Sequence, residues 1–379
     1  MSDFFPEIKK VFGFGCMRLP MNGEEVDIEQ FKEMTDLFID NGFNYFDTAH
    51  GYLNGKSETA IKEALSMRHS RDEFILTDKL TEPFFNSQED IRPFFMKQLD
   101  WCGVDYFDFY LMHAQGAGNY PKFKKCKAYE TAFELKKEGL IKHVGISFHD
   151  KPEVLDQILT DYPEIEIVQI QFNYLDYNDP SVESRNVYDV ARAHNKPLLV
   201  MEPVKGGNLV NLPPEADKIL KDLNGGSNAS YAIRFAAGFD GMRMVLSGMS
   251  SLDQMKDNIS CMKDFKPLTD VEKAAIEGVV GVFKGFDLIP CTSCHYCIEE
   301  NHCPKKIKIP DMFSCLNSKT MFSSDWNQDF YYNSVLTSGE NGKASDCIKC
   351  GACERLCPQH LEIRNLLEKV ADKFEKKAE

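Results

Sequence analysis

Eight of the thirteen cysteines in this chain of 379 residues fall into two tight groups near the C-terminus. The groups are Cys291-x2-Cys294-x2-Cys297-x5-Cys303-Pro304 and Cys347-x2-Cys350-x2-Cys353-x3-Cys357-Pro358. Thiolates at CxxCxxC spacing can bind three corners of one iron–sulfur cube. Two tetrahedral zinc sites would also use eight thiolates, but zinc sites typically pair their ligands as CxxC. The spacing therefore favours iron–sulfur clusters over zinc.

The second group matches the cysteine run of bacterial ferredoxins, and the first differs by two extra residues before its last cysteine. In that arrangement the fourth cysteine of each run serves the other cluster. The resemblance implies two 4Fe–4S clusters, one on Cys291, Cys294, Cys297 and Cys357 and one on Cys347, Cys350, Cys353 and Cys303. The N-terminus shows no secretion signal, so we expect these cysteines to bind metal rather than form disulfides, in a cytoplasmic protein.

A second set of reactive side chains surrounds the sequence FNYFDTAHGY, residues 43–52. Residues 43–46 predict a buried strand, which ends at Asp47, and Tyr52 lies in the loop that follows. A polar residue at a strand end and another in the next loop are typical of the mouth of a parallel βα barrel. A strand with a capping aspartate and an exposed tyrosine would fit these residues too.

The scaffold for such a site is predicted by alternating apolar strand runs and helical patterns. We expect strands at 11–16, 43–46, 74–77, 106–111, 142–146, 165–171, 197–201 and 242–246. We expect helices at 27–41, 57–66, 88–101, 126–138, 182–194, 252–262 and 269–283, one more starting at Pro152, and helical pieces over about 214–237. This alternation allows a closed barrel or a doubly wound sheet. Polar residues at five strand ends favour the barrel, where such ends converge: Asp47, Lys79, His113, Ser147 and Gln169. No GxGxxG follows the first strand, which counts against a Rossmann fold.

The stretch FDTAHGY followed by GKSE resembles the active-site entry of the aldo-keto reductases, and residues 11–284 can be aligned along that family's barrel. The resemblance implies an α/β fold, a (β/α)8 TIM barrel over residues 1–284, followed by a small, mostly α-helical ferredoxin-like domain over 285–379. It also implies a catalytic tetrad of Tyr52, Lys79, Asp47 and His113.

These four residue types suit the reduction of a carbonyl. The oxyanion that hydride delivery creates needs a proton, and tyrosine, with a reference pKa of about 10, is a poor acid near neutral pH. A lysine ammonium beside the phenol would favour the phenolate, and Asp47 would hold Lys79 in place. His113 would orient the carbonyl. Individually, the residues would also fit a structural ion pair, a rim tyrosine and a core histidine.

The same resemblance places the nicotinamide contacts at Ser147, Gln169 and Met201, and those of the rest of the nucleotide at Gly248, Ser250, Gln254 and Asn258. Phe148 replaces the usual asparagine beside Ser147. Gln254 stands where the family has an arginine for the 2′-phosphate of NADP, so the choice between NAD and NADP stays open.

The charge and hydropathy of the chain exclude some classes of binding partner. A net charge of −15 argues against nucleic-acid binding, and no run of about 18 apolar residues predicts a membrane span. We expect a small carbonyl or alcohol as substrate, and a ferredoxin or another electron-transfer protein as a further partner. The alternatives to a nicotinamide-dependent reductase are a ferredoxin-linked reductase that takes single electrons through the clusters, and a non-enzymatic electron carrier. Aromatic residues after the strands hint at an apolar substrate: Phe84, Phe85, Tyr120, Phe123, Phe148 and Phe172.

Overall fold

The computed structural model describes residues 4–179, 182–299, 303–322 and 325–375. The chain forms two compact units, which we call the barrel unit (1–204 and 229–270) and the cysteine unit (205–228 and 271–379). Residues 205–228 and 271–284 therefore belong to the cysteine unit in the structure. The sequence-based domain boundary after residue 284 stays a prediction. Among the described residues, no helix has both the length and the apolar character needed to cross a membrane.

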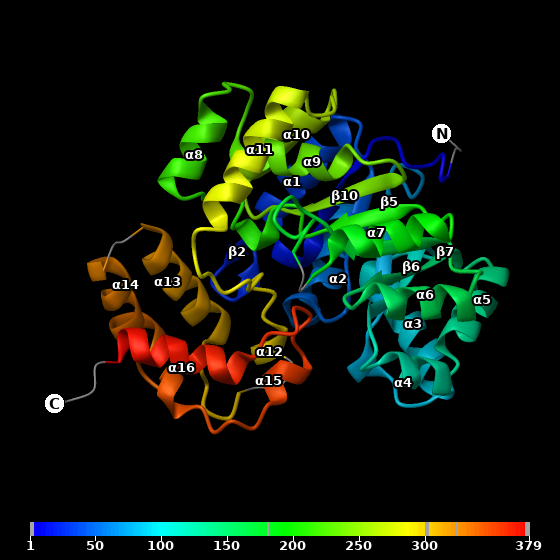
Figure 1. Ribbon diagram of the computed structural model, residues 1–379. Coiled ribbons are helices and arrows are strands. Elements are labelled where there is room, and N and C mark those ends of the chain that lie inside the picture. Colours follow the sequence, from blue (N-terminus) through cyan, green and yellow to red (C-terminus); the bar gives the residue numbers. More distant parts are fainter. Residues whose placement is uncertain (1–3, 180–181, 300–302, 323–324, 376–379) are drawn as a thin grey trace. The chain divides into compact units, whose positions relative to one another are not determined.

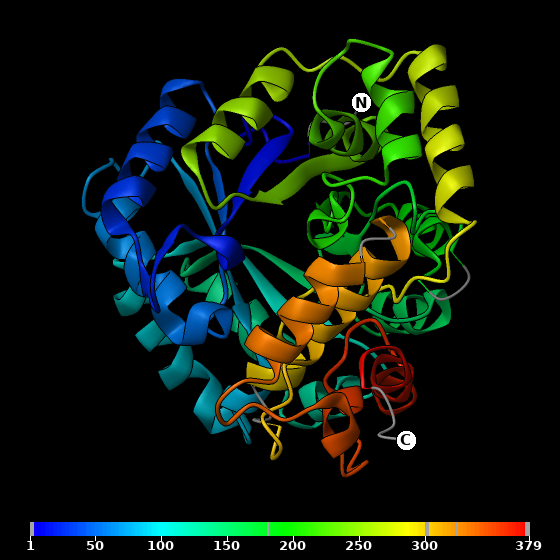
Figure 2. The same ribbon diagram turned by 90° about the vertical axis from the view of Figure 1, so that its left-hand side faces the viewer.

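The barrel unit is built on a closed barrel of eight parallel strands, as predicted (Figures 1 and 2). Around the barrel the order is β1-β10-β9-β8-β7-β6-β5-β4, and β4 closes on β1. The strands are β1 (Phe12–Gly15), β4 (Tyr45–Asp47), β5 (Ile75–Leu80), β6 (Phe107–Gln115), β7 (Ile141–Phe148), β8 (Ile167–Gln171), β9 (Leu198–Met201) and β10 (Met242–Gly248). A short hairpin of β2 (Met21–Asn22) and β3 (Glu25–Val26) stands apart from the barrel sheet.

Alternation along the strands decides which side chains face the barrel interior. An apolar cluster contains Tyr45, Ile75, Phe109, Ile167 and Leu199, each from a different strand, and forms the interior core. The expected site residues follow on the same side of the same strands, two or four positions nearer the carboxyl end: Asp47, Lys79, His113, Gln169 and Met201. The strand period of two thus places them together at the mouth.

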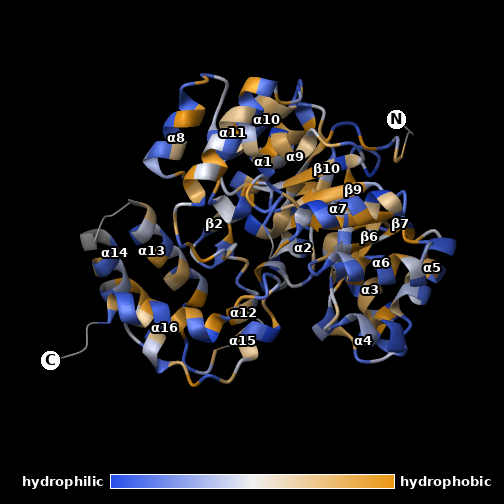
Figure 3. Cartoon of the chain, viewed as in Figure 1, coloured by the Kyte–Doolittle hydropathy of each residue, from blue (hydrophilic) through white to orange (hydrophobic). Residues whose placement is uncertain are grey.

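Helices cover the outer face of the strands. Residues of opposite parity, such as Phe46, Leu76 and Val168, pack with the helices in a larger apolar cluster. The colouring by hydropathy shows this contrast between apolar strands and mixed helices (Figure 3). The helices carried wholly or mainly by this unit are α1 (Ile28–Asp40), α2 (Lys56–Ile61), α3 (Gln88–Cys102), α4 (Tyr120–Lys125), α5 (Ala128–Lys137), α6 (Pro152–Asp161), α7 (Ser184–Ala193), α9 (Asn228–Ala237) and α10 (Leu252–Met262).

The cysteine unit is helical and has its own core. Its helices are α8 (Pro214–Lys221), α11 (Asp270–Phe283), α12 (Tyr296–Glu299), α13 (Ile309–Phe322), α14 (Asp325–Tyr331), α15 (Ala352–Arg355) and α16 (Ile363–Phe374). Met312 and Phe313 of α13 pack with Leu367 and Val370 of α16, and Tyr332 stacks on Phe374 at 4.6 Å between ring centroids. Buried Cys297 and Cys353 belong to the same core, so the expected metal ligands are part of the packing.

Candidate active site and cysteine-lined cavities

Lys79 is the centre of a buried polar network at the mouth of the barrel. Its Nζ donates hydrogen bonds to Asp47 Oδ1 at 2.6 Å, to the Thr48 carbonyl at 2.7 Å and to Tyr52 Oη at 3.2 Å. Gln169 Nε2 donates to the other carboxylate oxygen of Asp47 at 3.3 Å. Lys79 is fully buried, and burial raises the pKa of Asp47 while Lys79 and Gln169 act to lower it. The contacts of a buried ammonium thus fix three of the four tetrad residues.

His113 completes the tetrad from β6. Its ring lies 5.9 Å from the Tyr52 ring, and its Nδ1 is 2.7 Å from Thr81 Oγ1. Burial, together with the positive charge of Lys79, holds the pKa of His113 well below its usual range. The imidazole is therefore neutral at pH 7, and Thr81 holds it in orientation.

An irregularity in the pairing of β6 with β7 lies next to His113 and sets the direction of its side chain. The pairing shifts between Met112 and Gln115, and Ala114 adopts a left-handed φ of 49°. Ser147 Oγ accepts a hydrogen bond from the Ala114 amide at 2.7 Å, and Asn119 Nδ2 donates to the Ala114 carbonyl at 3.0 Å. Bulges of this kind are frequent next to active sites because they redirect a side chain. Ser147, expected to contact nicotinamide, therefore also supports the backbone beside His113.

The loop that carries Tyr52 is anchored at both sides. Leu53 and Asn54 have φ of 53° and 54°, so the loop holds two non-glycine residues in the left-handed region. Thr48 Oγ1 and Ser57 Oγ lie 2.7 Å apart, and Ser57 Oγ donates to the Cys16 carbonyl at 2.9 Å. His50 stacks on Trp101 at 4.4 Å between ring centroids. These contacts fix a strained loop and, with it, the phenol.

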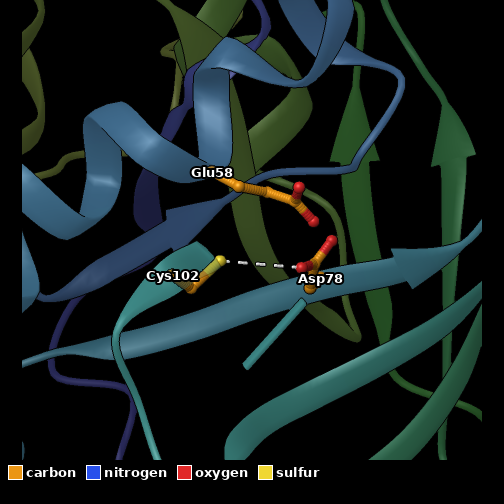
Figure 4. Close-up of side chains that lie close together, drawn as sticks. All are labelled: Glu58, Asp78 and Cys102. Atoms are coloured by element: carbon orange, nitrogen blue, oxygen red, sulfur yellow. Dashed lines mark hydrogen bonds between the residues drawn. The ribbon is translucent and has the colours of Figure 1, made fainter. Parts of the chain in front are cut away.

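Behind β5, on the face opposite Lys79, lies a buried pair of carboxyl groups (Figure 4). Glu58 of α2 and Asp78 of β5 have no exposed surface, and with Cys102 Sγ their ligand atoms lie within 4.8 Å of one another. His50 Nδ1 is 2.6 Å from Glu58 Oε2, and Gln98 Nε2 donates to Glu58 Oε1 at 3.2 Å. Burial raises the pKa of Glu58 to about 7 and that of Asp78 well above its usual range. The pair therefore holds a proton near neutral pH, a feature that the sequence did not reveal.

The residues expected to hold the rest of the nucleotide lie at the β10–α10 junction. Ser250 N donates to Gln254 Oε1 at 2.7 Å, and Ser251 Oγ caps α10 by accepting from Gln254 N at 3.3 Å. Asn258 is buried and donates to Ser247 Oγ at 3.2 Å. Met201 is the last residue of β9 and takes no part in the hydrogen bonds described at the β10–α10 junction.

Arg18 is the residue that sequence reasoning missed. The aliphatic part of its side chain passes over Gly248, where a Cβ atom would lie 3.2–3.3 Å from three Arg18 carbons. Ser250 Oγ donates to the Arg18 carbonyl at 2.9 Å. No arginine or lysine lies between Arg243 and Lys256 in the sequence, and the fold instead brings Arg18 to Gly248 from the turn after β1. The pairing of Gly15 with Gly248 in the barrel register would have been the signal.

The aromatic residues that hinted at an apolar substrate are mostly packing residues. Five of them are buried members of the core around the barrel: Phe85, Tyr120, Phe123, Phe148 and Phe172. Phe84 is 36% exposed and stacks on Phe94 at 5.4 Å between ring centroids. These five side chains therefore pack in a core, as loop aromatics often do, and an apolar substrate stays a prediction.

The two cysteine groups line two cavities in the cysteine unit. The larger cavity, with about 380 Å³ of empty space that includes open solvent, is lined by Cys303, Cys347, Cys350 and Cys353. The smaller, with about 320 Å³ counted in the same way, is lined by Cys291, Cys294 and Cys357. Cys297 reaches both cavities. The remaining walls are largely apolar, with Ile309 shared between them. Four thiols around an apolar cavity are a donor set that fits a 4Fe–4S cluster, and the grouping agrees with the crossed ligand sets inferred from the spacing.

Comparison with known proteins identifies a known family for the barrel and a known type of domain for the cysteine-rich segment. Residues 11–280 match the model of the aldo/keto reductase family, and residues 290–362 match that of a 4Fe–4S dicluster domain. An uncharacterized oxidoreductase of Bacillus subtilis, YqkF, is 25% identical over 294 residues, covering 70% of this chain and 90% of that protein. The NADH-specific methylglyoxal reductase of Escherichia coli is 30% identical over 154 residues, 36% of this chain and 45% of that protein.

Solved structures repeat the fold. The aldo-keto reductase AKR11C1 of Bacillus halodurans, in its holo form, superposes with a TM-score of 0.57 at 27% identity over 71% of this chain and 91% of that one. An aldo-keto reductase of Klebsiella pneumoniae in complex with NADPH gives a TM-score of 0.59 at 19% identity, over 71% and 90% of the two chains. The chain is therefore an oxidoreductase that belongs to the aldo/keto reductase family and carries an iron–sulfur domain of the 4Fe–4S dicluster type.

Proposed function

We propose that the protein reduces the carbonyl of a small substrate, or oxidises the corresponding alcohol, with a nicotinamide cofactor at the mouth of the barrel. The observation that carries this proposal is the buried Lys79 ammonium, 2.6 Å from Asp47 and 3.2 Å from the Tyr52 phenol oxygen. A structural ion pair would not need a phenol held at the same ammonium.

Each tetrad residue has a separate part in the proposed reaction. When bound, the nicotinamide supplies or accepts the hydride at the substrate carbon. Tyr52 donates its phenolic proton to the carbonyl oxygen, and Lys79 stabilises the phenolate that remains. Asp47 keeps Lys79 in position and balances its charge. Neutral His113, oriented by Thr81, aligns the carbonyl beside Tyr52.

The proposed nucleotide contacts are Ser147, Gln169 and Met201 for the nicotinamide and Gly248, Ser250, Gln254 and Asn258 for the remainder. Exposed Ser250 and Gln254 suit direct contact, whereas buried Asn258 suits a role in holding the β10–α10 junction. Arg18 beside Gly248 supplies a cation for the phosphates of the nucleotide. Since NAD and NADP share the pyrophosphate, this cation suits either nucleotide, and Gln254 offers no positive charge for the 2′-phosphate of NADP.

In the cysteine unit we propose two 4Fe–4S clusters with the crossed ligand sets, one in each cavity. Clusters of this type transfer single electrons, whereas nicotinamide transfers two as a hydride. A ferredoxin-linked activity is the second candidate function, and the exposure of Cys350 favours it. The membership of a reductase family and the complete tetrad favour an enzyme over an electron carrier with an inactive barrel.

The test is the change Tyr52→Phe in the intact protein, which removes the proposed acid and leaves the ring. With NADPH or NADH and a panel of small aldehydes and ketones, including methylglyoxal, we expect kcat to fall at least about 100-fold. Tyr106→Phe is the matched control, because Tyr106 contacts Lys142 instead of the tetrad, and its kcat should stay within about twofold. Turnover that survives Tyr52→Phe would refute the assignment.

A further inference from the structure

The two cysteine-lined cavities differ in their access to solvent. Cys350, in the wall of the larger cavity, is the only exposed one of the thirteen cysteines. Its neighbour Ile348 leaves 56% of its surface exposed, which is unusual for a large aliphatic residue. In the smaller cavity Cys297 is buried, the other cysteines are partly buried and Thr292 is 1% exposed. A cluster in the larger cavity would therefore be the one within reach of another protein.

Basic residues are frequent in the two chain segments that contribute most of the wall of the larger cavity. Segments 304–308 and 346–355, which we call the basic rim, contain five basic residues and two acidic ones, Asp346 and Glu354. The five bases are all exposed: Lys305, Lys306, Lys308, Lys349 and Arg355. Segments 292–296 and 358–362, beside the smaller cavity, contain no lysine or arginine. Lysine and arginine thus line only the larger of the two cavities, through Lys305 and Arg364, in a chain whose net charge is −15.

Part of this charge is not neutralised by the residues that the structure describes. Lys306 pairs with Glu340 and Lys349 with Glu368. Lys305, Lys308 and Arg355 form no ion pair with any residue that the structure describes. An apolar centre inside a charged, solvated rim is the usual anatomy of a protein interface, and electron-transfer interfaces are among the smallest of these.

We propose that Ile348 and the basic rim are the docking surface for an acidic one-electron carrier protein, which exchanges electrons with the cluster on Cys303, Cys347, Cys350 and Cys353. In each exchange the metal centre of the reduced carrier loses one electron and this cluster gains it; no bond forms or breaks. The inference rests on the ligand sets proposed above and is independent of the hydride chemistry assigned to Tyr52.

The experiment mixes the anaerobic, iron-loaded full-length protein with an acidic plant-type [2Fe–2S] ferredoxin that has been reduced and freed of reductant. Stopped-flow absorbance follows oxidation of the ferredoxin, and EPR follows reduction of the clusters. In the double variant Lys305→Glu, Lys308→Glu, the second-order rate constant at low salt should fall at least about tenfold. The difference from the unmodified protein should disappear near 0.5 M salt, where the Debye length is only about 4 Å.

The control is Lys97→Glu with Lys125→Glu, which makes the same change in net charge on the barrel unit. Both lysines are exposed, and their rate should stay within about twofold of the unmodified protein. Iron content and EPR spectra, measured first, separate a lost cluster from a lost docking site. A rate that is unchanged in the Lys305/Lys308 variant, or that does not depend on salt in the unmodified protein, would overturn the proposal. Failure of the Tyr52 assignment would leave this result intact.

Discussion

At the scale of single residues, the site depends on how a buried ammonium is satisfied. Lys79 has no exposed surface, and its three hydrogen-bond partners are a carboxylate, a carbonyl and a phenol. Loss of Asp47, the charged partner, would be strongly destabilising because the buried ammonium would stay uncompensated, whereas loss of the neutral Tyr52 hydroxyl leaves that ion pair in place. Asp47 is therefore needed for folding as well as for the proposed chemistry, so a change at Tyr52 or Thr81 reports on function more cleanly.

Thr81 provides the first test at this scale. The change Thr81→Val keeps the side-chain shape but removes the hydroxyl 2.7 Å from His113 Nδ1. One hydrogen bond of about 1 kcal/mol is lost, so kcat should fall roughly fivefold. Thr81→Ser should restore most of the rate, which a merely structural role would not require. A Thr81→Val protein as active as the original would show that His113 is held by other contacts.

Arg18 provides the second test at the scale of single residues. If its charge binds nucleotide phosphate, Arg18→Met should raise the KM for NADPH about 10-fold or more and change kcat little, because the interaction is the same in the ground and transition states. The control Arg185→Met alters an exposed arginine that pairs with Asp189 on α7 and should leave both constants unchanged. Equal KM values for Arg18→Met and the original protein would remove Arg18 from the nucleotide site.

At the scale of elements, the carboxyl pair joins α2 to β5 behind the site. The folded state raises the pKa of Glu58 from 4.5 to about 7, so the folded protein binds more protons than the unfolded chain between these values. Its contribution to stability is therefore complete below about pH 4.5 and is lost as the pH rises through about 7. The pair should make the α2–β5 contact weaker in mildly alkaline solution.

The change Glu58→Gln tests this sign. Its Tm, relative to that of the original protein, should become more favourable from pH 5 to pH 8, by the equivalent of roughly 1–3 kcal/mol. Glu63→Gln, at an exposed position beyond α2, should show no such trend. A difference in Tm that is constant with pH, or that changes in the opposite direction, would contradict the account.

Apolar periodicity was sufficient to predict the eight strands and most helices, because it reports burial directly. Helix 252–262 was predicted with the bounds of α10. The third strand was expected as an apolar run over 74–77 that ends near Asp78 and Lys79, and it continues through Leu80, with Asp78 and Lys79 both buried. The bulge at Ala114, the contact of Arg18 with Gly248 and the proximity of Glu58 to Asp78 depend on tertiary packing. Such contacts between distant positions leave no periodic pattern in a single sequence.

At the scale of the whole molecule, the chain combines two units with separate cores and different chemistry. In the proposed function, the barrel unit arranges side chains for a proton and a hydride, and the cysteine unit arranges thiols for single-electron centres. Since Cys297 and Cys353 are buried in the core of the cysteine unit, cluster binding and folding of that unit should be coupled.

The change Cys350→Ser should remove one cluster. Iron analysis of the anaerobically purified protein should give about eight iron atoms per chain originally and about four in Cys350→Ser. Cys315→Ser is the matched control, because Cys315 is buried in the same unit and lines neither cavity, and it should keep the full content. Full iron content in Cys350→Ser would contradict the proposed ligand set.

The most direct test of the central claim follows the hydrogen that is transferred. The protein is given a small aldehyde and NADPH or NADH deuterated at the reactive C4 position of the nicotinamide, and the alcohol product is examined by mass spectrometry. The account predicts deuterium on the carbinol carbon with the original protein and little product with Tyr52→Phe. Product without deuterium, or product formed from reduced ferredoxin in the absence of nicotinamide, would contradict it.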